Sequence, residues 1–251
     1  MNPQLKALLL LITIGVVITV IKKLLKKTNK SIENLKLEDT HKLMIVAHPD
    51  DETIWGGAEL LKDNYLVVCI TCGSQKTRVN EFEKVMKLSN NKYLMLGYPD
   101  KKNNKRDDWR DYYFQICDAL RKIINYKDWD LIITHNPDGE YGHEHHKMTS
   151  KIVTNILKNK DKLYYFGKYY KPSKMKVIKN NLTKVEPQYL DIKINKMIEV
   201  YKSQSFIKKT FSHMFEYENW NKASDWNSEN WRIYKSSKGD QIDESTCKWF
   251  W

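Results

Sequence analysis

The chain has 251 residues, of which 41% are hydrophobic and 29% are charged. This balance excludes a largely disordered protein and allows one sizeable core. Its four cysteines are too few to indicate a disulfide framework. The formal net charge of +12 suits an anionic partner such as a phospholipid surface or a phosphorylated compound. The lysines are spread along the chain and no nucleic-acid-reading motif is recognisable, so we expect no nucleic-acid partner.

An apolar segment without charges, 7–21, lies near the N-terminus, and four lysines follow it at once: Lys22, Lys23, Lys26 and Lys27. The segment is a little shorter than the ~20 residues of a spanning helix, but flanking leucines and snorkelling lysines can extend it. A cleaved signal peptide, the main alternative, carries its charge before the apolar run; a helix lying on the membrane surface is another. We expect a single-pass anchor over 1–27 with the rest of the chain on the cytoplasmic side, at an endoplasmic reticulum-type membrane if the protein is eukaryotic or viral.

Beyond a polar linker expected over 28–41, strand-like and helix-like segments alternate. The expected strands are 43–47, 65–71, 93–96, 131–134, 163–166 and 175–178. The expected helices are 54–61, 78–88, 109–126, 143–157, 192–201 and 206–220. This alternation predicts an α/β fold over 42–251, a Rossmann-like three-layer domain with a mostly parallel sheet, preceded by the N-terminal transmembrane helix.

An extension rich in aromatic residues begins at about residue 187. Five tryptophans lie near its end: Trp220, Trp226, Trp231, Trp249 and Trp251. We expect them to pack, for example over a sheet edge. A membrane-surface contact and a substrate lip are the alternatives.

Histidines and carboxylates follow two of the expected strands. The first strand is followed by Ala47-His48-Pro49-Asp50-Asp51-Glu52, and the helix after the fourth strand begins within Gly142-His143-Glu144-His145-His146. The carboxyl ends of parallel strands meet at one edge of a sheet, so the two motifs should converge. Such residues suit a catalytic metal centre, which needs three protein ligands, an open position for water and a base. Read separately, the carboxylates could merely cap a helix and the histidines could decorate a surface.

The spacing suggests a role for each side chain. We assign His48, Asp51 and His146 as ligands of Zn²⁺, since the first two flank one turn and His146 lies within the helix. His143, three residues before His146, shares its helix face and can point at the substrate from the helix mouth. His145 points to another face, and we expect it to be exposed to solvent.

The remaining polar groups suit amide hydrolysis. Asp50, beside a ligand, can take a proton from water whose pKa zinc lowers towards ~7. His143, as an imidazolium, can stabilise the oxyanion that forms on the attacked carbonyl. Asp138 can orient His143 from the adjoining loop, and Tyr141 can point into the same pocket.

Together these motifs resemble the PIG-L/LmbE-like family of zinc-dependent de-N-acetylases. The resemblance covers about residues 43–150, and residues 197–204 resemble a late family segment. It implies zinc ligands at His48, Asp51 and His146, with Asp50 as general base and His143 as acid or oxyanion-stabilising residue. These are the roles that the spacing suggests.

The resemblance also implies residues around the substrate. Arg78 resembles a substrate-contacting arginine after the second strand, and Tyr141 a tyrosine that helps at the oxyanion. The turn at Asp100 is similar too, although Lys101 stands where the family commonly has glycine. We therefore assign Arg78, Asp100 and Asp138 to substrate binding, with an altered local loop at Lys101.

By this resemblance the protein is a metal-dependent hydrolase that removes the N-acetyl group from an N-acetylglucosamine conjugate. The expected anchor and the basic surface favour N-acetylglucosaminyl-phosphatidylinositol, the substrate in GPI-anchor biosynthesis. A soluble N-acetylhexosamine sugar or glycan is the alternative, and a catalytically silent, membrane-tethered binding protein is a more remote one. The expected partners are a glycan or glycolipid substrate and, through the N-terminal helix, a membrane.

Overall fold

The computed structural model describes residues 4–6, 12–13, 15–16, 32 and 34–226. Its main sheet has the strand order β3-β2-β1-β6-β7-β8. The strands are β1 (Lys42–Val46), β2 (Tyr65–Thr71), β3 (Lys92–Tyr98), β6 (Leu131–Thr134), β7 (Leu163–Phe166) and β8 (Trp220–Lys222). All neighbouring pairs are parallel except β7 and β8, which are antiparallel. The predicted α/β fold with a mostly parallel sheet is therefore confirmed.

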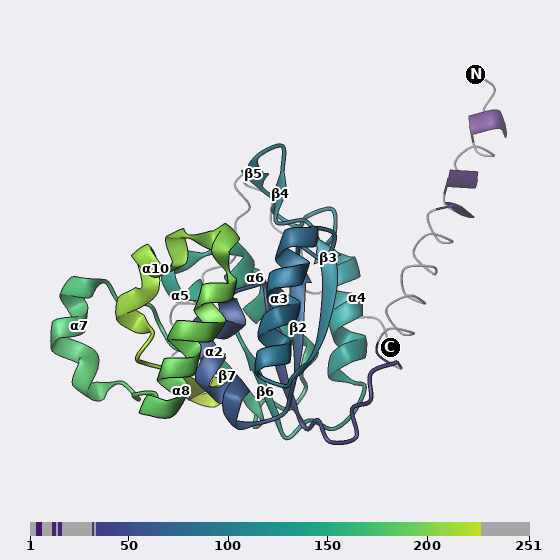
Figure 1. Cartoon of the computed structure of the whole chain (residues 1–251). Helices are drawn as coiled ribbons and strands as arrows, with labels where there is room; N and C mark the ends of the chain where they lie inside the picture. The colour runs from purple at the N-terminus through teal and green to yellow at the C-terminus, as the bar shows by residue number, and fades with distance from the viewer. Residues whose placement is uncertain (1–3, 7–11, 14, 17–31, 33, 227–251) are drawn as a thin grey trace.

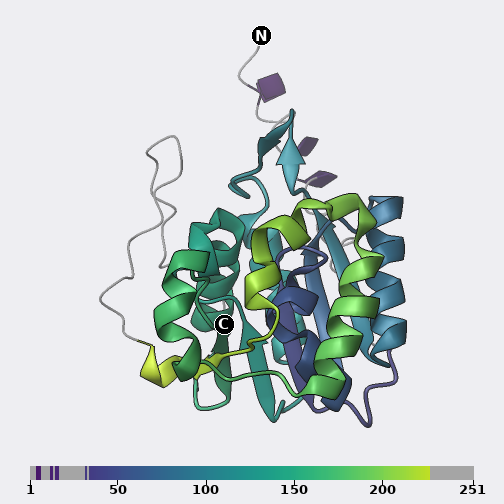
Figure 2. The same ribbon diagram turned by 60° about the vertical axis from the view of Figure 1, so that its left-hand side comes forward.

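Helices cover both faces of this sheet (Figures 1 and 2). One face packs against α4 (Tyr113–Ile124) and α6 (Glu144–Ile156), and the other against α2 (Asp51–Lys62) and α3 (Lys76–Leu88). The second face also receives the C-terminal helices, which are α7 (Pro172–Ile178), α8 (Pro187–Ile192), α9 (Ile198–Val200) and α10 (Phe206–Phe211). With both faces covered, β2 is buried along its whole length, and β1 and β6 are buried except at their first residue, which explains their apolar sequence.

A small hairpin, β4 (Lys101–Lys102) and β5 (Lys105–Arg106), projects beyond the carboxyl end of β3 (Figure 1). The chain returns from this hairpin to α4, which begins at Tyr113 and not at Trp109 as predicted. Trp109 is fully buried and adopts a left-handed φ of 53°, which ends any helical path there. The hairpin and its return segment, residues 107–112, lie at the sheet edge where the candidate site is expected.

Two C-terminal predictions are wrong in detail. The segment 175–178, predicted as a strand, belongs to α7, because Pro172 sits at its first turn with a φ suited to helix initiation. The helix predicted over 206–220 ends at Met214 after α10 and a 3₁₀ turn. Trp220 instead begins β8 on the sheet edge, where its indole N–H donates to the Trp55 carbonyl at 3.1 Å. Its packing role is as expected, whereas Trp231, Trp249 and Trp251 lie outside the described residues.

A buried ion pair ties the C-terminal helices to α2. Lys193 is fully buried, and its Nζ lies 2.6 Å from Glu218 Oε1 and 3.0 Å from the Ile54 carbonyl. Glu218 in turn accepts hydrogen bonds from the backbone N–H groups of Ala58 and Glu59.

We expect Lys193→Met to lower the free energy of unfolding by about 2 kcal/mol, because Glu218 keeps its N–H donors but loses its cation. Denaturant unfolding measures this loss; the double variant Lys193→Met/Glu218→Gln should recover part of it, and no recovery would contradict the explanation.

Little of the predicted N-terminal anchor can be compared with the structure. Most of the segment 7–21 lies outside the described residues. Within the described part of the chain, no helix combines the length and apolarity needed to cross a membrane. The anchor over 1–27 thus stays a prediction. Within the predicted linker, Ile32 and Leu37 are buried in the core beside α4, so part of 28–41 packs on the domain.

Candidate active site

The loop after β1 directs the neighbouring carboxylates of Asp50 and Asp51 towards different partners. Asp50 has a left-handed φ of 116°, a conformation that costs free energy and persists only where other contacts hold it. Here its N–H donates to Glu52 Oε2 at 3.0 Å, and its carbonyl accepts the N–H groups of Thr53 and Ile54 at 3.0 and 2.9 Å. Asp50 then contacts Arg78, whereas Asp51 contacts a group of histidines.

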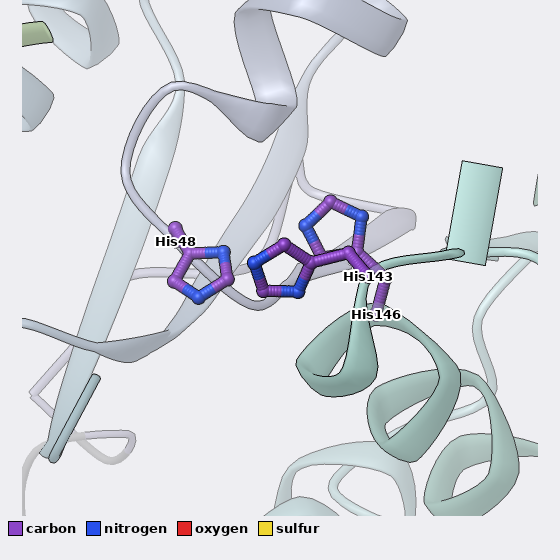
Figure 3. A group of neighbouring side chains, drawn as sticks. All are labelled: His48, His143 and His146. Atoms are coloured by element: carbon purple, nitrogen blue, oxygen red, sulfur yellow. The ribbon is translucent and has the colours of Figure 1, made fainter. Parts of the chain in front are cut away.

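The predicted metal ligands come together at the carboxyl ends of β1 and β6. Asp51 Oδ2 lies 3.2 Å from His48 Nδ1, and Asp51 Oδ1 lies 3.2 Å from His146 Nε2. Figure 3 shows the His48 ring facing His143 and His146, with ring centroids 4.7 and 5.4 Å away. Sets of three that fit one ion are His48/His143/His146, Asp51/His135/His146 and His48/Asp100/His145. The predicted set of His48, Asp51 and His146 is not one of these three, but it shares two residues with each of the first two sets.

His146 has the hydrogen bonding of a metal ligand. Its Nδ1 lies 2.5 Å from Glu140 Oε2, so the ring proton sits there and Nε2 keeps a free lone pair. Nε2 is buried and makes no hydrogen bond to any described group, although Asp51 Oδ1 is 3.2 Å away. Tetrahedral zinc with bonds of ~2.1 Å holds its donor atoms ~3.4 Å apart. The pair of His146 and Asp51 therefore fits a zinc ion, with Glu140 as the outer carboxylate that orients the histidine.

Sequence reasoning missed Glu140 and His135. Both are buried, and His135 Nδ1 lies 3.0 Å from Glu140 Oε2. His135 Nε2 accepts the Ala47 N–H at 3.0 Å, which fixes its ring beside β1. Burial alone would raise the pKa of Glu140, but the adjacent His135 and His146 outweigh it and hold the pKa below its usual value. His135 follows β6 directly, as His48 closely follows β1. The expectation that site residues follow the carboxyl ends of the strands could therefore have found it.

Asp50 is paired with Arg78 at the pocket wall. Arg78 Nη2 donates to Asp50 Oδ2 at 2.9 Å and also contacts the Pro49 carbonyl. Arg78 Nη1 bonds Glu81 at 3.2 Å and Ser203 at 3.3 Å. Burial and then the charge of Asp51 raise the pKa of Asp50 to about 8, against the opposing effect of Arg78. The arginine predicted to contact substrate thus also serves as the cationic partner of the predicted base.

We expect Arg78→Met to move the acidic limb of the kcat/KM profile upward by on the order of one pH unit. A general base acts when deprotonated, and removal of the cation raises the pKa of Asp50 further. Arg78→Lys keeps a charge and should shift the limb less. Initial rates between pH 5 and 10 measure both. An unmoved limb in Arg78→Met would contradict the pairing.

The structure changes the roles predicted around His143. Burial, followed by the neighbouring His146 and His48, holds the pKa of His143 well below its usual value, so it is neutral and not the expected imidazolium. Its Nδ1 accepts the His145 N–H at 3.2 Å, which caps α6, and its Nε2 contacts Arg106. Asp138 pairs with Lys168 at 3.0 Å, and among the described contacts none joins it to His143.

Most of the predicted residues surround a pocket of about 460 Å³. Its walls include His48, Asp50, Asp51, Arg78, Asp100, Tyr141 and His143, together with Gln75, Lys101, Arg106, Gln204, Phe206 and Phe211. Asp138 and the buried His146 are not among the lining residues. Burial raises the pKa of Asp100, but His48 outweighs it and lowers the value to about 2, so this carboxylate is ionised at the pocket. Tyr141 is 46% exposed and its ring lies 5.7 Å from that of His143.

His145 is buried and not exposed as predicted. It is 1% exposed, stacks on Trp109 with ring centroids 4.0 Å apart, and places Nδ1 2.9 Å from His48 Nε2. Burial, then the adjacent His48, lowers the pKa of His145 to about 3, so the ring is neutral. Helical spacing separates its face from that of His146, but the return segment of the hairpin covers it.

These features define an α/β domain with a candidate metal centre at the carboxyl ends of β1 and β6. Residues 43–157 match the PIG-L family, described as GlcNAc-PI de-N-acetylase, and the chain belongs to this family.

The chain is similar in sequence to one protein and in structure to another. It is 34% identical over 191 residues to the uncharacterized protein L374 of Acanthamoeba polyphaga mimivirus, covering 69% of this chain and 76% of that protein. The N,N′-diacetylchitobiose deacetylase from Pyrococcus horikoshii, solved with its inhibitor MPG, has a similar structure with a TM-score of 0.52 at 19% identity. That likeness covers 71% of this chain and 77% of the deacetylase, and it shows a shared fold. The predicted family is confirmed.

Proposed function

We propose that this protein is a zinc-dependent de-N-acetylase that releases acetate from an N-acetylglucosamine unit. The observation that carries the proposal is the buried, unbonded Nε2 of His146 beside Asp51, with Glu140 holding the opposite ring nitrogen. Such an arrangement fits a cation better than a purely structural cluster. Membership of the PIG-L family supports de-N-acetylation as the reaction.

The chain's own residues suit amide hydrolysis. A zinc ion bound by His48, Asp51 and His146 would supply Lewis-acid chemistry to water and to the amide carbonyl. Asp50 takes a proton from the attacking water, and its pKa of about 8 makes it a stronger base than an ordinary carboxylate. His143 lines the pocket, where its ring can form a hydrogen bond with the leaving amine. Tyr141 is placed to donate a hydrogen bond to the substrate carbonyl.

We infer that the acetylated sugar is joined to an anionic group, with N-acetylglucosaminyl-phosphatidylinositol as the leading candidate. Lys101 and Arg106 of the hairpin line the pocket mouth, where they can face a phosphate. The predicted N-terminal anchor fits a lipid-linked substrate met at the cytoplasmic face of a membrane. A soluble acetylated sugar is the second candidate, favoured by the fold shared with the chitobiose deacetylase.

The test is acetate release by the full-length, zinc-loaded protein from three compounds: N-acetylglucosaminyl-phosphatidylinositol, N,N′-diacetylchitobiose and free N-acetylglucosamine. Release that is strongest from the lipid, stops on chelation and returns with zinc would support the full proposal. Release from the sugars alone would replace the lipid with a soluble substrate. No release from any compound by a protein with bound zinc would overturn the proposed reaction on these substrates.

A further inference from the structure

A chain of hydrogen bonds connects the hairpin to the predicted ligand His48. His145 Nε2 lies 2.6 Å from the Asp107 carbonyl, and His145 Nδ1 lies 2.9 Å from His48 Nε2. A carbonyl accepts hydrogen bonds and never donates them, so the His145 proton is on Nε2. A single proton fits between His145 Nδ1 and His48 Nε2, and in the uncharged form of His145, whose one proton is on Nε2, it belongs to His48 Nε2.

With its proton on Nε2, an uncharged His48 ring has Nδ1 free to bind a cation. Nδ1 faces Asp51 Oδ2 at 3.2 Å, a contact that a ring proton makes favourable when His48 is cationic and that a metal ion can replace when His48 is uncharged. Donor atoms ~3.4 Å apart are what tetrahedral zinc requires. The same pattern holds on the other side of Asp51, where Glu140 leaves His146 Nε2 bare.

We propose that His145 is a positioning residue that fixes the tautomer and direction of the His48 ring, so that Nδ1 is the nitrogen offered to the metal. The inference rests on the zinc centre of the proposed function. It gives the two histidine ligands corresponding outer partners: a backbone carbonyl relayed through His145 for His48, and Glu140 for His146. Such outer partners orient ligands and typically change metal affinity by ~10–100-fold.

The surroundings of His145 keep it in place. Its ring stacks on Trp109 with an interplanar angle of 9°. Trp109 is held by two further bonds, since its N–H donates to Asp107 Oδ1 at 2.7 Å and its indole N–H to the Pro99 carbonyl at 2.8 Å. These contacts maintain the left-handed conformation of Trp109, which is otherwise unfavourable for so large a residue. The Asp107 carbonyl that orients His145 is fixed by the same turn.

Asp100 is the nearest competitor for the His48 proton. Its Oδ1 lies 3.4 Å from His48 Nε2 and 3.7 Å from His145 Nδ1. Neither approach counts as a hydrogen bond, and Oδ1 has no hydrogen-bond partner among the described residues. His145 therefore makes the shorter and better directed contact. A second ion held by His48, Asp100 and His145 is the alternative explanation of this cluster, and it predicts a different metal content.

Two variants of the full-length protein separate the hydrogen bond from the packing. His145→Phe keeps a ring on Trp109 but removes the acceptor, whereas His145→Asn keeps an acceptor near the Nδ1 position and loses the stack. Chelator competition gives zinc affinity, and metal analysis gives zinc per chain. We expect His145→Phe to weaken zinc binding by ~10–100-fold and His145→Asn to stay within about threefold of wild type. Thermal unfolding of the metal-free proteins shows whether each variant is folded.

Several results would overturn the role of His145. Wild-type zinc affinity in His145→Phe would show that the bond does not matter, and equal losses in both variants would show that the stack matters instead. Two zinc ions per wild-type chain, falling to one in His145→Phe, would make His145 a ligand. Zinc bound with these affinities but no acetate release would remove the proposed function and leave His145 as a positioning residue.

A measurement on the zinc-loaded wild type needs no variant. Long-range ¹H–¹⁵N correlation spectra of histidine side chains report which ring nitrogen carries the proton. We expect His48 and His145 both to carry it on Nε2. A proton on His48 Nδ1 would overturn the proposal even if neither variant folds.

Discussion

Asp50→Asn lowers kcat/KM for acetate release by on the order of 10³-fold and leaves zinc binding unchanged, because general-base catalysis is lost while every predicted ligand remains. The side chain is suited to the task by its burial and its pKa of about 8. Arg78 at 2.9 Å keeps it pointed along the pocket wall. Steady-state rates and zinc content, measured on the same preparation, test the expectation.

Asp128→Asn is the matched control for this substitution. Asp128 has an 89% exposed side chain and bonds Lys162 at 2.9 Å, and it is not among the residues that line the pocket. Its variant should have wild-type rates. If Asp50→Asn lost zinc in proportion to activity, the carboxylate would be a ligand and not a base.

Glu140→Gln should weaken zinc binding by about 100-fold, the upper range for loss of an outer carboxylate. The buried carboxylate holds two rings at once, through 2.5 Å to His146 Nδ1 and 3.0 Å to His135 Nδ1. An amide of the same shape has one acceptor and no negative charge, so His146 becomes a poorer donor to the metal. Activity should fall at limiting zinc and recover in part at high zinc.

The exposed Glu144, two residues before His146, supplies the control. Glu144→Gln removes the same charge four residues further along, at the start of α6, and should leave zinc affinity unchanged. Equal affinities for the Glu140 and Glu144 variants would show that Glu140 does not orient His146.

The core of the site was predictable because site residues follow the carboxyl ends of the strands, and those ends can be recognised from local sequence. Short apolar runs mark where β1 and β6 end, and His48, Asp51 and His146 follow those ends. The family resemblance gave the same ligands. The contacts of Asp51 with both His48 and His146 agree with that prediction without testing which ion the residues bind.

The errors arose where a distant segment decides the environment. The helical spacing placed His145 on a face away from His146 but did not show that the turn at Trp109 covers that face. Asp138 was assigned to His143 by sequence proximity, whereas Lys168 reaches it from the loop after β7. The apolar run 175–178 fits a strand or a helix equally, and only the preceding Pro172 favours the helix.

The Arg78 contacts have a consequence for how such proteins diverge. Ser203 Oγ and N–H both bond Glu81, at 2.7 and 2.8 Å, and Glu81 and Ser203 together hold the guanidinium that faces Asp50. Ser203 lies well beyond residues 43–157, the part that matches the family. The strength of the base is therefore open to selection through the late segment 197–204, far along the chain from the histidine and carboxylate motifs of the site. Two members with identical motifs can differ in working pH through this remote segment.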